Sequence, residues 1–379
     1  MAKIKTALGL MSGTSMDGID IALVETDGRD HVVPGPVASH AFDAAFAQRI
    51  SAALEIAAGL ERREDRPGDL AALEAEITRR HGEAVARFLQ DNRLDSAAVD
   101  VIGFHGQTVV HRPDHGLTVQ LGNGAQLAEM TGIATVWDMR ANDMENGGQG
   151  APLVPVFHQA LARRIGASGV AAFVNVGGIA NVTFVAPDGP PVAFDCGPGN
   201  ALIDQWMRAN TNRDYDEDGD LARAGRADDA TVDAYLADPF FARSAPKSLD
   251  RNDFSLDAMP AMEAGDGAAT LSEITARSIA FSARTAAMTP DRWIVSGGGA
   301  HNRAIVDRLK AHLGPERVMT AEAADLSSDM MEAQAWAYLA VRSLRGLALT
   351  YPSTTGCEEP VTGGVLSLPG HGVTARRAS

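Results

Sequence analysis

A strand–turn–strand pattern occurs twice in this chain, and this repeat limits the folds that the chain can adopt. The first copy runs through the glycine- and hydroxyl-rich segment 9–20 (GLMSGTSMDGID) and continues as an apolar strand over residues 19–24. The second copy has an apolar strand over 171–176, a turn at 177–178 and another strand over 181–185. A hairpin with the same layout in each half predicts two lobes that duplicate one architecture.

The two hairpins align residue by residue. The aligned pairs are Asn181 with Asp20, Val182 with Ile21, Val185 with Val24 and Asp188 with Asp27. In the first hairpin, glycines permit a tight turn and hydroxyl groups add donors, so that several N–H groups can point at one anion. Asp17 and Asp20 are suited to hold a metal ion that accompanies a phosphate. We therefore expect each hairpin to offer a glycine turn to a ligand.

Two further turns follow apolar strands. The strand 191–194 ends at Asp195, and the turn that follows leads into a helix for which Asn200 is a suitable N-cap. A carboxylate at the carboxyl end of a strand holds the usual ligand-facing position of an open α/β sheet, although an aspartate can also simply cap such a turn. The glycines 297–299 follow the strand 293–295 and let a flat ring or a phosphate lie against the backbone.

Composition narrows the class of protein. A chain of 379 residues, 45% hydrophobic and 22% charged, suits a globular protein of two domains. Its 33 basic and 49 acidic residues give a net charge of −16, which argues against nucleic-acid or anionic-membrane binding. No apolar stretch approaches the length that spans a membrane. The two cysteines, Cys196 and Cys357, lack a metal-ligand spacing and suggest a reducing compartment, so we expect the cytoplasm.

Three glycine turns spread over two similar lobes predict an α/β fold of the two-lobed actin-like ATPase (ribonuclease H-like) class, with duplicated sheets and an interlobe cleft. The predicted N-terminal lobe comprises residues 1–137 and about 360–379, and the predicted C-terminal lobe comprises 138–359. In such a cleft, two turns grip the phosphates of ATP and the third seats the nucleoside.

Several longer motifs resemble those of the anhydro-N-acetylmuramic acid kinase family, in the family's order and over nearly the whole chain. The matching runs are GLMSGTSMDGID, GFHGQT, GGQGAPLVP, NVGGIANVT, FDCGPGN, SGGGAHN and MEAQAWAYLA. The resemblance implies a small-molecule sugar substrate closed by a 1,6-anhydro bridge. Water opens the bridge, O6 takes the γ-phosphoryl group of ATP, and the products are N-acetylmuramate 6-phosphate and ADP, in murein recycling. It also implies a homodimer.

The resemblance assigns roles to individual residues. Asp195 is the expected general base that activates the water, Glu332 is a second catalytic carboxylate, and Arg140 is the expected partner of the lactyl carboxylate. The expected ATP-binding residues are Ser12, Gly13, Thr14, Ser15, Met16, Asp17, Gly18, Asp20, Asn175, Gly177, Gly178, Gly297, Gly298, Gly299 and Asn302. The expected substrate-binding residues are His105, Gln107, Arg140, Gly197 and Asn200.

Magnesium is expected with ATP, but its protein partners stay open. Related phosphate turns often begin with an aspartate that anchors Mg²⁺ through water, and Met11 and Asn175 stand at those places here. Asp17, Asp20 and Asp195 are the remaining candidates.

Other interpretations exist. His105, His111 and His115 suggest a metal site, but Pro113 interrupts the run. Ser15, His105 and Asp17 can be combined as a hydrolase triad, but the chain has no GxSxG elbow here. The stronger rival is a nucleotide switch without sugar chemistry, which would turn over ATP alone. The irregular segment 239–254, with Lys247, Arg251 and two exposed-looking aromatic residues, reads as a lid or an interface.

Overall fold

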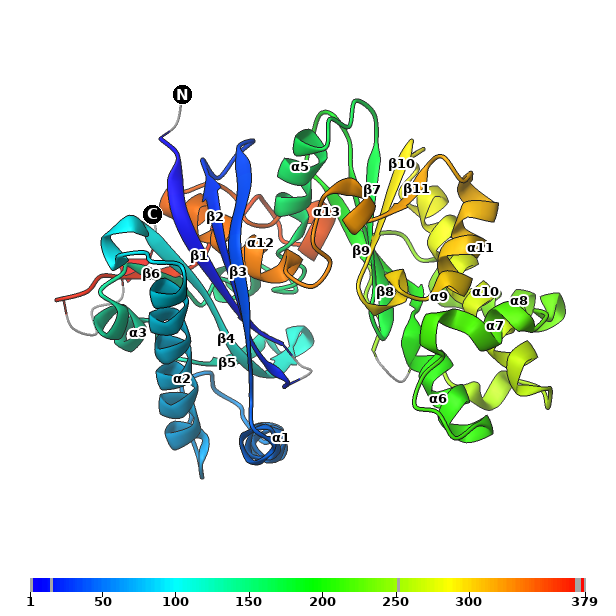
Figure 1. The fold of residues 1–379 in the computed structure, drawn as a ribbon, viewed down its shortest axis with the longest axis horizontal. Helices are drawn as coiled ribbons and strands as arrows, with labels where there is room; N and C mark the ends of the chain where they lie inside the picture. The colour runs from blue at the N-terminus through cyan, green and yellow to red at the C-terminus, as the bar shows by residue number, and fades with distance from the viewer. Residues whose placement is uncertain (1–2, 14–15, 251–252, 372–375, 378–379) are drawn as a thin grey trace. The chain divides into compact units, whose positions relative to one another are not determined.

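The computed structural model describes residues 3–13, 16–250, 253–371 and 376–377. The chain divides into two compact units (Figure 1). Unit 1 comprises Met1–Arg164 and Met330–Ser379, and unit 2 comprises Ile165–Asp329. Each unit is built around its own sheet, so the predicted α/β class with two sheets is confirmed.

The sheet of unit 1 has the strand order β13-β12-β6-β4-β1-β2-β3, and β5 pairs with β4. Its strands are β1 (Lys5–Ser12), β2 (Gly18–Thr26), β3 (Val32–Ala41), β4 (Val101–Arg112), β5 (Leu117–Leu121), β6 (Thr135–Trp137), β12 (Val365–Ser367) and β13 (Arg376–Arg377). The helices of this unit are α1 (Ala44–Ala57), α2 (Leu70–Asp91), α3 (Gly124–Thr131), α4 (Ala141–Glu145), α5 (Pro155–Arg164), α12 (Met331–Leu344) and α13 (Pro352–Thr355).

The sheet of unit 2 has the strand order β11-β10-β7-β8-β9. Its strands are β7 (Ala171–Val176), β8 (Ile179–Val185), β9 (Val192–Pro198), β10 (Arg292–Ser296) and β11 (Val318–Thr320). The helices are α6 (Asn200–Asn210), α7 (Asp220–Ala224), α8 (Asp229–Leu236), α9 (Pro239–Ala242), α10 (Ala264–Thr285) and α11 (Arg303–Leu313).

The two sheets repeat one topology. In unit 1, β1 pairs antiparallel with β2, β2 pairs antiparallel with β3, and β4 and β6 extend the sheet in parallel. In unit 2, β7, β8, β9, β10 and β11 have the same order and directions. The hairpin registers also agree, because Asp20 lies opposite Met11 and Asn181 lies opposite Asn175. The predicted alignment of the hairpins is therefore confirmed at the level of residue pairs.

Unit 1 covers the two faces of its sheet differently. Leu8 and Leu10 of β1 belong to a cluster with buried residues of α2 and α3. A side chain at Gly9 would point to the opposite face of the sheet, which α12 covers. A Cβ added at Gly9 would lie 1.8 Å from the Ala333 carbonyl oxygen of this helix. Gly103 of β4 lies against the same helix, and a Cβ added there would be 2.0 Å from the Trp336 carbonyl oxygen. These two glycines allow α12 to approach the sheet at backbone distance.

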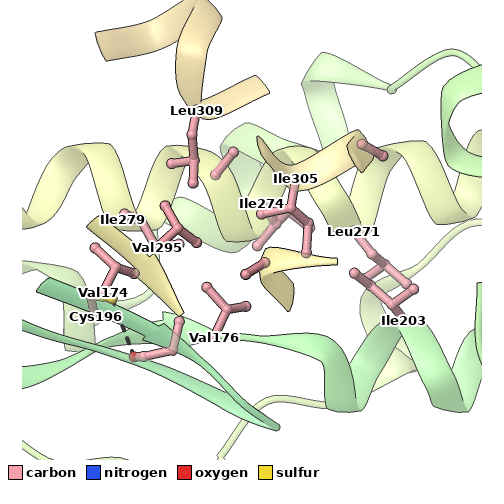
Figure 2. Packing of buried hydrophobic residues seen from close by; sticks show 14 of the residues in the cluster. Val174, Val176, Cys196, Ile203, Leu271, Ile274, Ile279, Val295, Ile305 and Leu309 are labelled. Atoms are coloured by element: carbon pink, nitrogen blue, oxygen red, sulfur yellow. Dashed lines mark hydrogen bonds between the residues drawn. The ribbon is translucent and has the colours of Figure 1, made fainter. Parts of the chain in front are cut away.

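The core of unit 2 is formed by its sheet and by buried residues of α6, α7, α8, α10 and α11, and Figure 2 shows part of it. Val174 and Val176 point from β7 toward Ile274 and Ile279 of α10. The Sγ atom of Cys196 on β9 donates a hydrogen bond to the Ala180 carbonyl oxygen at 3.2 Å. Burial raises the pKa of the Cys196 thiol, so this cysteine behaves as a small core residue.

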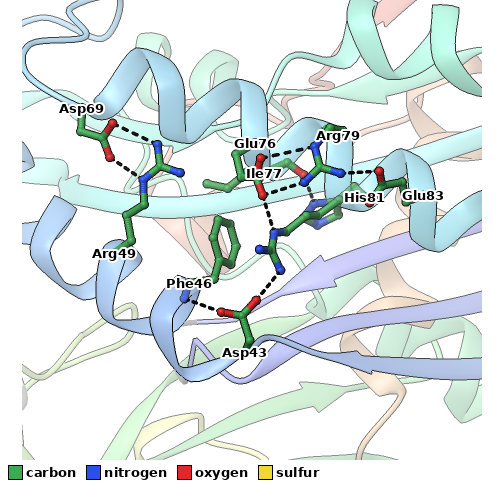
Figure 3. A network of polar contacts seen from close by, with 10 residues as sticks. Asp43, Phe46, Arg49, Asp69, Glu76, Ile77, Arg79, His81 and Glu83 are labelled. Carbon is green, nitrogen blue, oxygen red and sulfur yellow. Dashed lines mark hydrogen bonds and ion pairs between the residues drawn. The ribbon is translucent and has the colours of Figure 1, made fainter.

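Polar contacts orient α1 against α2 at the surface of unit 1 (Figure 3). Asp43 caps α1 by accepting from the Phe46 N–H, and its other oxygen accepts from Arg80 at 3.0 Å. The Arg80 guanidinium also bonds Glu76 at 2.8 Å and stacks 3.8 Å from the centre of the Phe46 ring. Arg49 reaches Asp69 with two donors. Because these charges are largely exposed, they contribute more to geometry than to stability.

The unit boundaries differ from the predicted lobe boundaries of 137/138 and 359/360. Residues 138–164 and α12 pack with unit 1. Two contacts give the physical reason. The small residues of α12 press on Gly9, and the buried Asp143 accepts from the Gly150 N–H at 2.6 Å and from Thr355 Oγ1 at 2.7 Å. The tail of the chain returns to the sheet of unit 1 as a strand, because β12 pairs with β6. The functional roles of the two lobes stay predictions.

Candidate active site

The first glycine turn joins β1 to β2 and is held against the end of β4. Ser12 is buried, and its hydroxyl donates to the Gly106 carbonyl oxygen at 2.9 Å. The side-chain amide of Gln107 donates to the Gly13 carbonyl oxygen at 3.0 Å, and the Met16 N–H donates to the same oxygen at 3.2 Å. Met16 has a φ of 56°, so its backbone lies in the left-handed region, as occurs in tight turns.

The other residues predicted for this turn differ in exposure and in the groups that they contact. An added Cβ at Gly18 would lie 2.6 Å from the His40 carbonyl oxygen, so this glycine lets β2 and β3 meet closely. Asp17 is exposed, and Asp20 accepts from the Ser39 hydroxyl at 2.6 Å. Thr14 and Ser15 lie outside the described residues, so their predicted contacts with ATP stay predictions.

His105 lies at the centre of a polar cluster in unit 1. Its Nδ1 lies 2.7 Å from the Gly106 carbonyl oxygen, and its Nε2 lies 3.3 Å from Nη2 of Arg140. Because a guanidinium only donates, Nε2 is the acceptor and the proton is on Nδ1. Burial, and then the Arg140 cation, lower the pKa of His105 to about 3. The imidazole is therefore neutral, and it holds the arginine in place.

Arg140 is fixed by this cluster and by the loop that follows it. Its Nη1 donates to the Gly150 carbonyl oxygen at 2.9 Å, and the guanidinium lies 5.6 Å from the centre of the Trp336 ring. Burial lowers the pKa of Arg140 to about 10, so the side chain stays a cation at neutral pH. A guanidinium has five N–H donors, so the two bonds just described leave capacity for an anionic group.

Glu332 lies in the first turn of α12, and its side chain is open to solvent. Desolvation by the surrounding protein raises the pKa of the Glu332 carboxyl, Arg140 lowers it, and Asp20 raises it again. The structure therefore brings three predicted site residues of unit 1 into one electrostatic neighbourhood. Trp336 is one helical turn beyond Glu332 and packs edge-on against His105 at 4.8 Å. The sequence pattern assigned Trp336 only to the buried stripe of this helix.

In unit 2, the second and third glycine turns lie side by side. Gly297 has a φ of 76°, and an added Cβ would lie 2.4 Å from Oδ1 of Asn175. A Cβ added at Gly299 would lie 2.3 Å from Cγ1 of Val176, and one at Gly298 would be 3.5 Å from Nδ2 of Asn200. The glycines therefore let the two turns pack closely at the carboxyl ends of β7 and β10, because a side chain at 297 or 299 would collide with Asn175 or Val176.

The N-terminus of α6 is occupied by the second turn. The Gly199 N–H donates to the Gly178 carbonyl oxygen at 3.0 Å, and the Asn200 N–H donates to the Gly177 carbonyl oxygen at 2.8 Å. The N-cap is Gly199, and Asn200 is the first helical residue, so the predicted N-cap was wrong by one position. The Asn200 side chain instead donates to the Val176 carbonyl oxygen at 3.0 Å.

Two other predicted residues have structural contacts. Oδ1 of Asn302 caps α11 by accepting from the N–H groups of Ala304 and Ile305. A Cβ at Gly197 would lie 2.5 Å from Oγ of Ser278 on α10, so this glycine permits close packing. Their predicted ligand contacts stay predictions.

Asp195 lies on β9, at the edge of the unit 2 sheet, and is partly buried. Its N–H donates to the Lys247 carbonyl oxygen at 3.0 Å, and its Oδ2 accepts from the Leu249 N–H at 2.9 Å. Burial raises the pKa of Asp195 from 3.8 to about 6, and the Leu249 N–H opposes that rise. A carboxylate with a pKa near the working pH is suited to general base catalysis.

The candidate cation ligands are separate carboxylates. Among the described residues, no group of three or more His, Cys, Asp and Glu side chains is arranged to hold a metal ion. Mg²⁺ that arrives with a nucleotide needs only one or two protein carboxylates, so Asp17, Asp20 or Asp195 fits that requirement. The three histidines have different places, because His105 is buried, His111 contacts Thr118 at 3.1 Å and His115 is exposed. In the described part of the chain, no helix is both long and apolar enough to cross a membrane.

The duplicated sheets define an α/β protein of two units with one repeated sheet topology. Two lines of comparison then identify the family. The model of the anhydro-N-acetylmuramic acid kinase family matches residues 5–368, and the chain belongs to this family. The chain is 50% identical over 370 residues to the anhydro-N-acetylmuramic acid kinase of Rhizobium etli, covering 97% of this chain and 100% of the relative. It is 49% identical to that of Agrobacterium fabrum, covering 97% and 99%. The enzyme class is therefore a kinase with an alcohol group as acceptor.

Similar solved structures are much more distant. Component A of (R)-2-hydroxyglutaryl-CoA dehydratase from Acidaminococcus fermentans is 11% identical, with a TM-score of 0.46, and the match covers 89% of this chain and 98% of that chain. A ROK family glucokinase from Streptomyces griseus, in complex with glucose and AMPPNP, is 13% identical with a TM-score of 0.38, covering 88% and 99%.

Proposed function

We propose that this kinase opens the 1,6-anhydro ring of 1,6-anhydro-N-acetylmuramic acid with water and phosphorylates O6 with ATP, as a step of murein recycling. The observation that carries the proposal is the Asp195 carboxyl, which lies on an edge strand with a pKa raised to about 6. The name of the family supplies the substrate class.

In the proposed reaction, Asp195 is the general base for ring opening. The carboxylate takes a proton from water, the water oxygen bonds to C1, and the bond from C1 to O6 breaks. O6 takes the γ-phosphoryl group, so the departing oxygen needs no separate acid. The proton then leaves Asp195 for solvent, and the products are N-acetylmuramate 6-phosphate and ADP.

The remaining residues bind and orient the reactants. Arg140, held by His105 and Gly150, offers its remaining donors to the lactyl carboxylate of the sugar. The Gln107 Oε1 atom is buried without a partner among the described residues and is suited to accept from a ligand. Glu332 is the second catalytic carboxylate in this proposal. Mg²⁺ bound with ATP, next to Asp17, Asp20 or Asp195, would neutralise phosphate charge.

A coupled assay of ADP release tests the proposal. We expect turnover only with the anhydro-sugar present, whereas a nucleotide switch would release ADP from ATP alone. Asp195→Asn should bind ATP and sugar normally and lose at least about 1,000-fold in kcat. The exposed Asp188→Asn is the matched control. The kcat of the unaltered enzyme should fall about tenfold per pH unit below about 6, because the base must be ionised. Retained activity in Asp195→Asn would refute the assignment.

A homodimer and a cytoplasmic location complete the proposal. Sedimentation velocity of the purified chain measures the first, and a mass of one chain at assay concentration would contradict it.

A further inference from the structure

A short segment of unit 2 flanks the proposed base on the open side of its strand. β9 is the last strand of its sheet, so its outer edge has no strand partner there among the described residues. Residues 247–249 occupy this edge at Asp195. The Lys247 carbonyl oxygen accepts from the Asp195 N–H, and the Leu249 N–H donates to the Asp195 carboxylate. One segment therefore fixes both the backbone and the side chain of the base.

The same segment is anchored by an unusual buried cation. The Lys247 side chain is buried, at 8% exposure, and its Nζ donates to the carbonyl oxygens of Phe240 at 3.0 Å and Phe241 at 3.4 Å. The ammonium also lies 4.3 Å from the centre of the Phe240 ring. These carbonyls belong to the short helix α9, and a cation is favourable at the C-terminal end of a helix.

The setting of Lys247 differs from that of an ordinary surface lysine. In the described part of the chain, Lys247 forms no ion pair with a carboxylate, so only carbonyl dipoles and an aromatic face compensate its charge. Burying an ammonium group in this way is costly. Phe240 and Phe241 are also buried, which corrects the expectation that aromatic residues of this segment are exposed. Arg251 lies outside the described residues.

We propose that Lys247 is a positioning residue for the reaction, which anchors the segment 247–249 on α9 and so holds the Asp195 carboxylate in its catalytic orientation. The inference rests on the proposed role of Asp195 as base. Lys247 itself does not touch the reacting atoms.

The anchor acts on the base through one hydrogen bond. The Leu249 N–H donates to Oδ2 of Asp195 at 2.9 Å and fixes the direction of the carboxylate. When the anchor is lost, the Leu249 N–H moves away, and the carboxylate loses this fixed orientation.

The test is a comparison of Lys247→Met with Lys310→Met in the full chain, using the ADP-release assay with the anhydro-sugar. Lys310 is a half-buried lysine on α11 of the same unit and serves as the matched control. Lys247→Met should lose about 10- to 100-fold in kcat with the KM values for ATP and sugar unchanged. Lys247→Arg, which keeps a cation, should recover part of the kcat.

The outcomes separate the inference from the proposed function. If Lys247→Met keeps the kcat of the unaltered enzyme while Asp195→Asn is inactive, the positioning role is refuted and the base assignment stands. If Asp195→Asn is active, the base assignment itself fails. Should Lys247→Met not fold, Leu249→Pro removes the N–H donor and keeps the anchor, and an unchanged kcat with unchanged KM values in that variant would overturn the inference.

Discussion

The two units share one sheet topology, but they position their predicted catalytic carboxylates with different elements. In unit 1, Glu332 is on a helix that Gly9 and Gly103 allow to lie against the sheet at backbone distance. In unit 2, the positions that align with these glycines are Phe173 and Ile294, and both are buried. Large side chains there leave no room for such an approach. Asp195 is instead part of a strand, and a loop positions it from the edge.

The electrostatic settings of the two carboxylates differ in the same way. Glu332 is open to solvent and feels the Arg140 cation. Asp195 is partly buried and, within the described residues, has one N–H donor and no ion pair. Burial raises the pKa of both carboxyls, but the Arg140 cation opposes the rise at Glu332, whereas the Leu249 N–H opposes it at Asp195. Asp195 is therefore the better candidate for a base.

The largest effect is expected from a substitution that prevents the close approach of α12 to the sheet of unit 1. Gly9→Ala places a Cβ at 1.8 Å from the Ala333 carbonyl oxygen, which is backbone and cannot rotate away. We expect a loss of more than about 4 kcal/mol in the free energy of unfolding, measured by urea denaturation. Gly59→Ala is the control, because the nearest atom there lies at 3.7 Å, and its effect should stay within about 0.5 kcal/mol. A folded Gly9→Ala variant of normal stability would show that α12 can move from the sheet.

The second prediction concerns the effect of the buried Asp195 carboxyl on stability at different pH values. A carboxyl whose folded-state pKa is about 6, against 3.8 ordinarily, binds more protons in the folded state between these two pH values. Its contribution to stability is therefore lost as pH rises from about 4 to 6. Asp195→Asn removes this loss and should raise the free energy of unfolding at pH 7.5 by about 2 to 3 kcal/mol, with no gain at pH 4.

Denaturation of Asp195→Asn at the two pH values measures this gain, with Asp188→Asn as the exposed control. An equal effect of Asp195→Asn at both pH values would contradict the raised pKa.

The smallest expected effect concerns the Arg140–Glu332 pair. Because Glu332 is open to solvent, we expect a coupling of about 0.5 to 1 kcal/mol in a double-mutant cycle of Arg140→Met and Glu332→Gln at pH 8. The pKa of Glu332 lies above its ordinary 4.5. The coupling should therefore disappear as pH falls through that raised value, where the carboxyl takes a proton. A coupling that persists at pH 4 would mean that the two side chains interact through packing rather than charge.

The hairpins show how far the sequence predicts this fold. The alignment of Asp20 with Asn181 predicted a duplicated sheet, and the observed pairing reproduces it. The strand ends at Ser12 and Gly297 were also predicted, because glycine and apolar runs mark them locally. The prediction that a strand ends at Asp195 was wrong, because β9 continues through this residue to Pro198. The unit boundaries were not predicted, since α12 joins unit 1 through contacts with β1, β2 and β4, which lie more than 200 residues away in the sequence.

The candidate site divides in the same way. The residue types at its glycine turns and the identities of Asp195 and Glu332 follow from motifs. The tautomer of His105, the bonds that hold Arg140 and the anchor at Lys247 do not, because each depends on partners that only the fold brings into contact.

The sequence by itself determined two α/β halves, three glycine turns and membership in a kinase family, because hydrophobic periodicity and short motifs are local properties. Only the tertiary structure decided which segments share a unit, why the pKa of Asp195 is raised, and what holds its carboxylate. Burial and hydrogen-bond partners set a pKa, and both arise only when distant segments pack together.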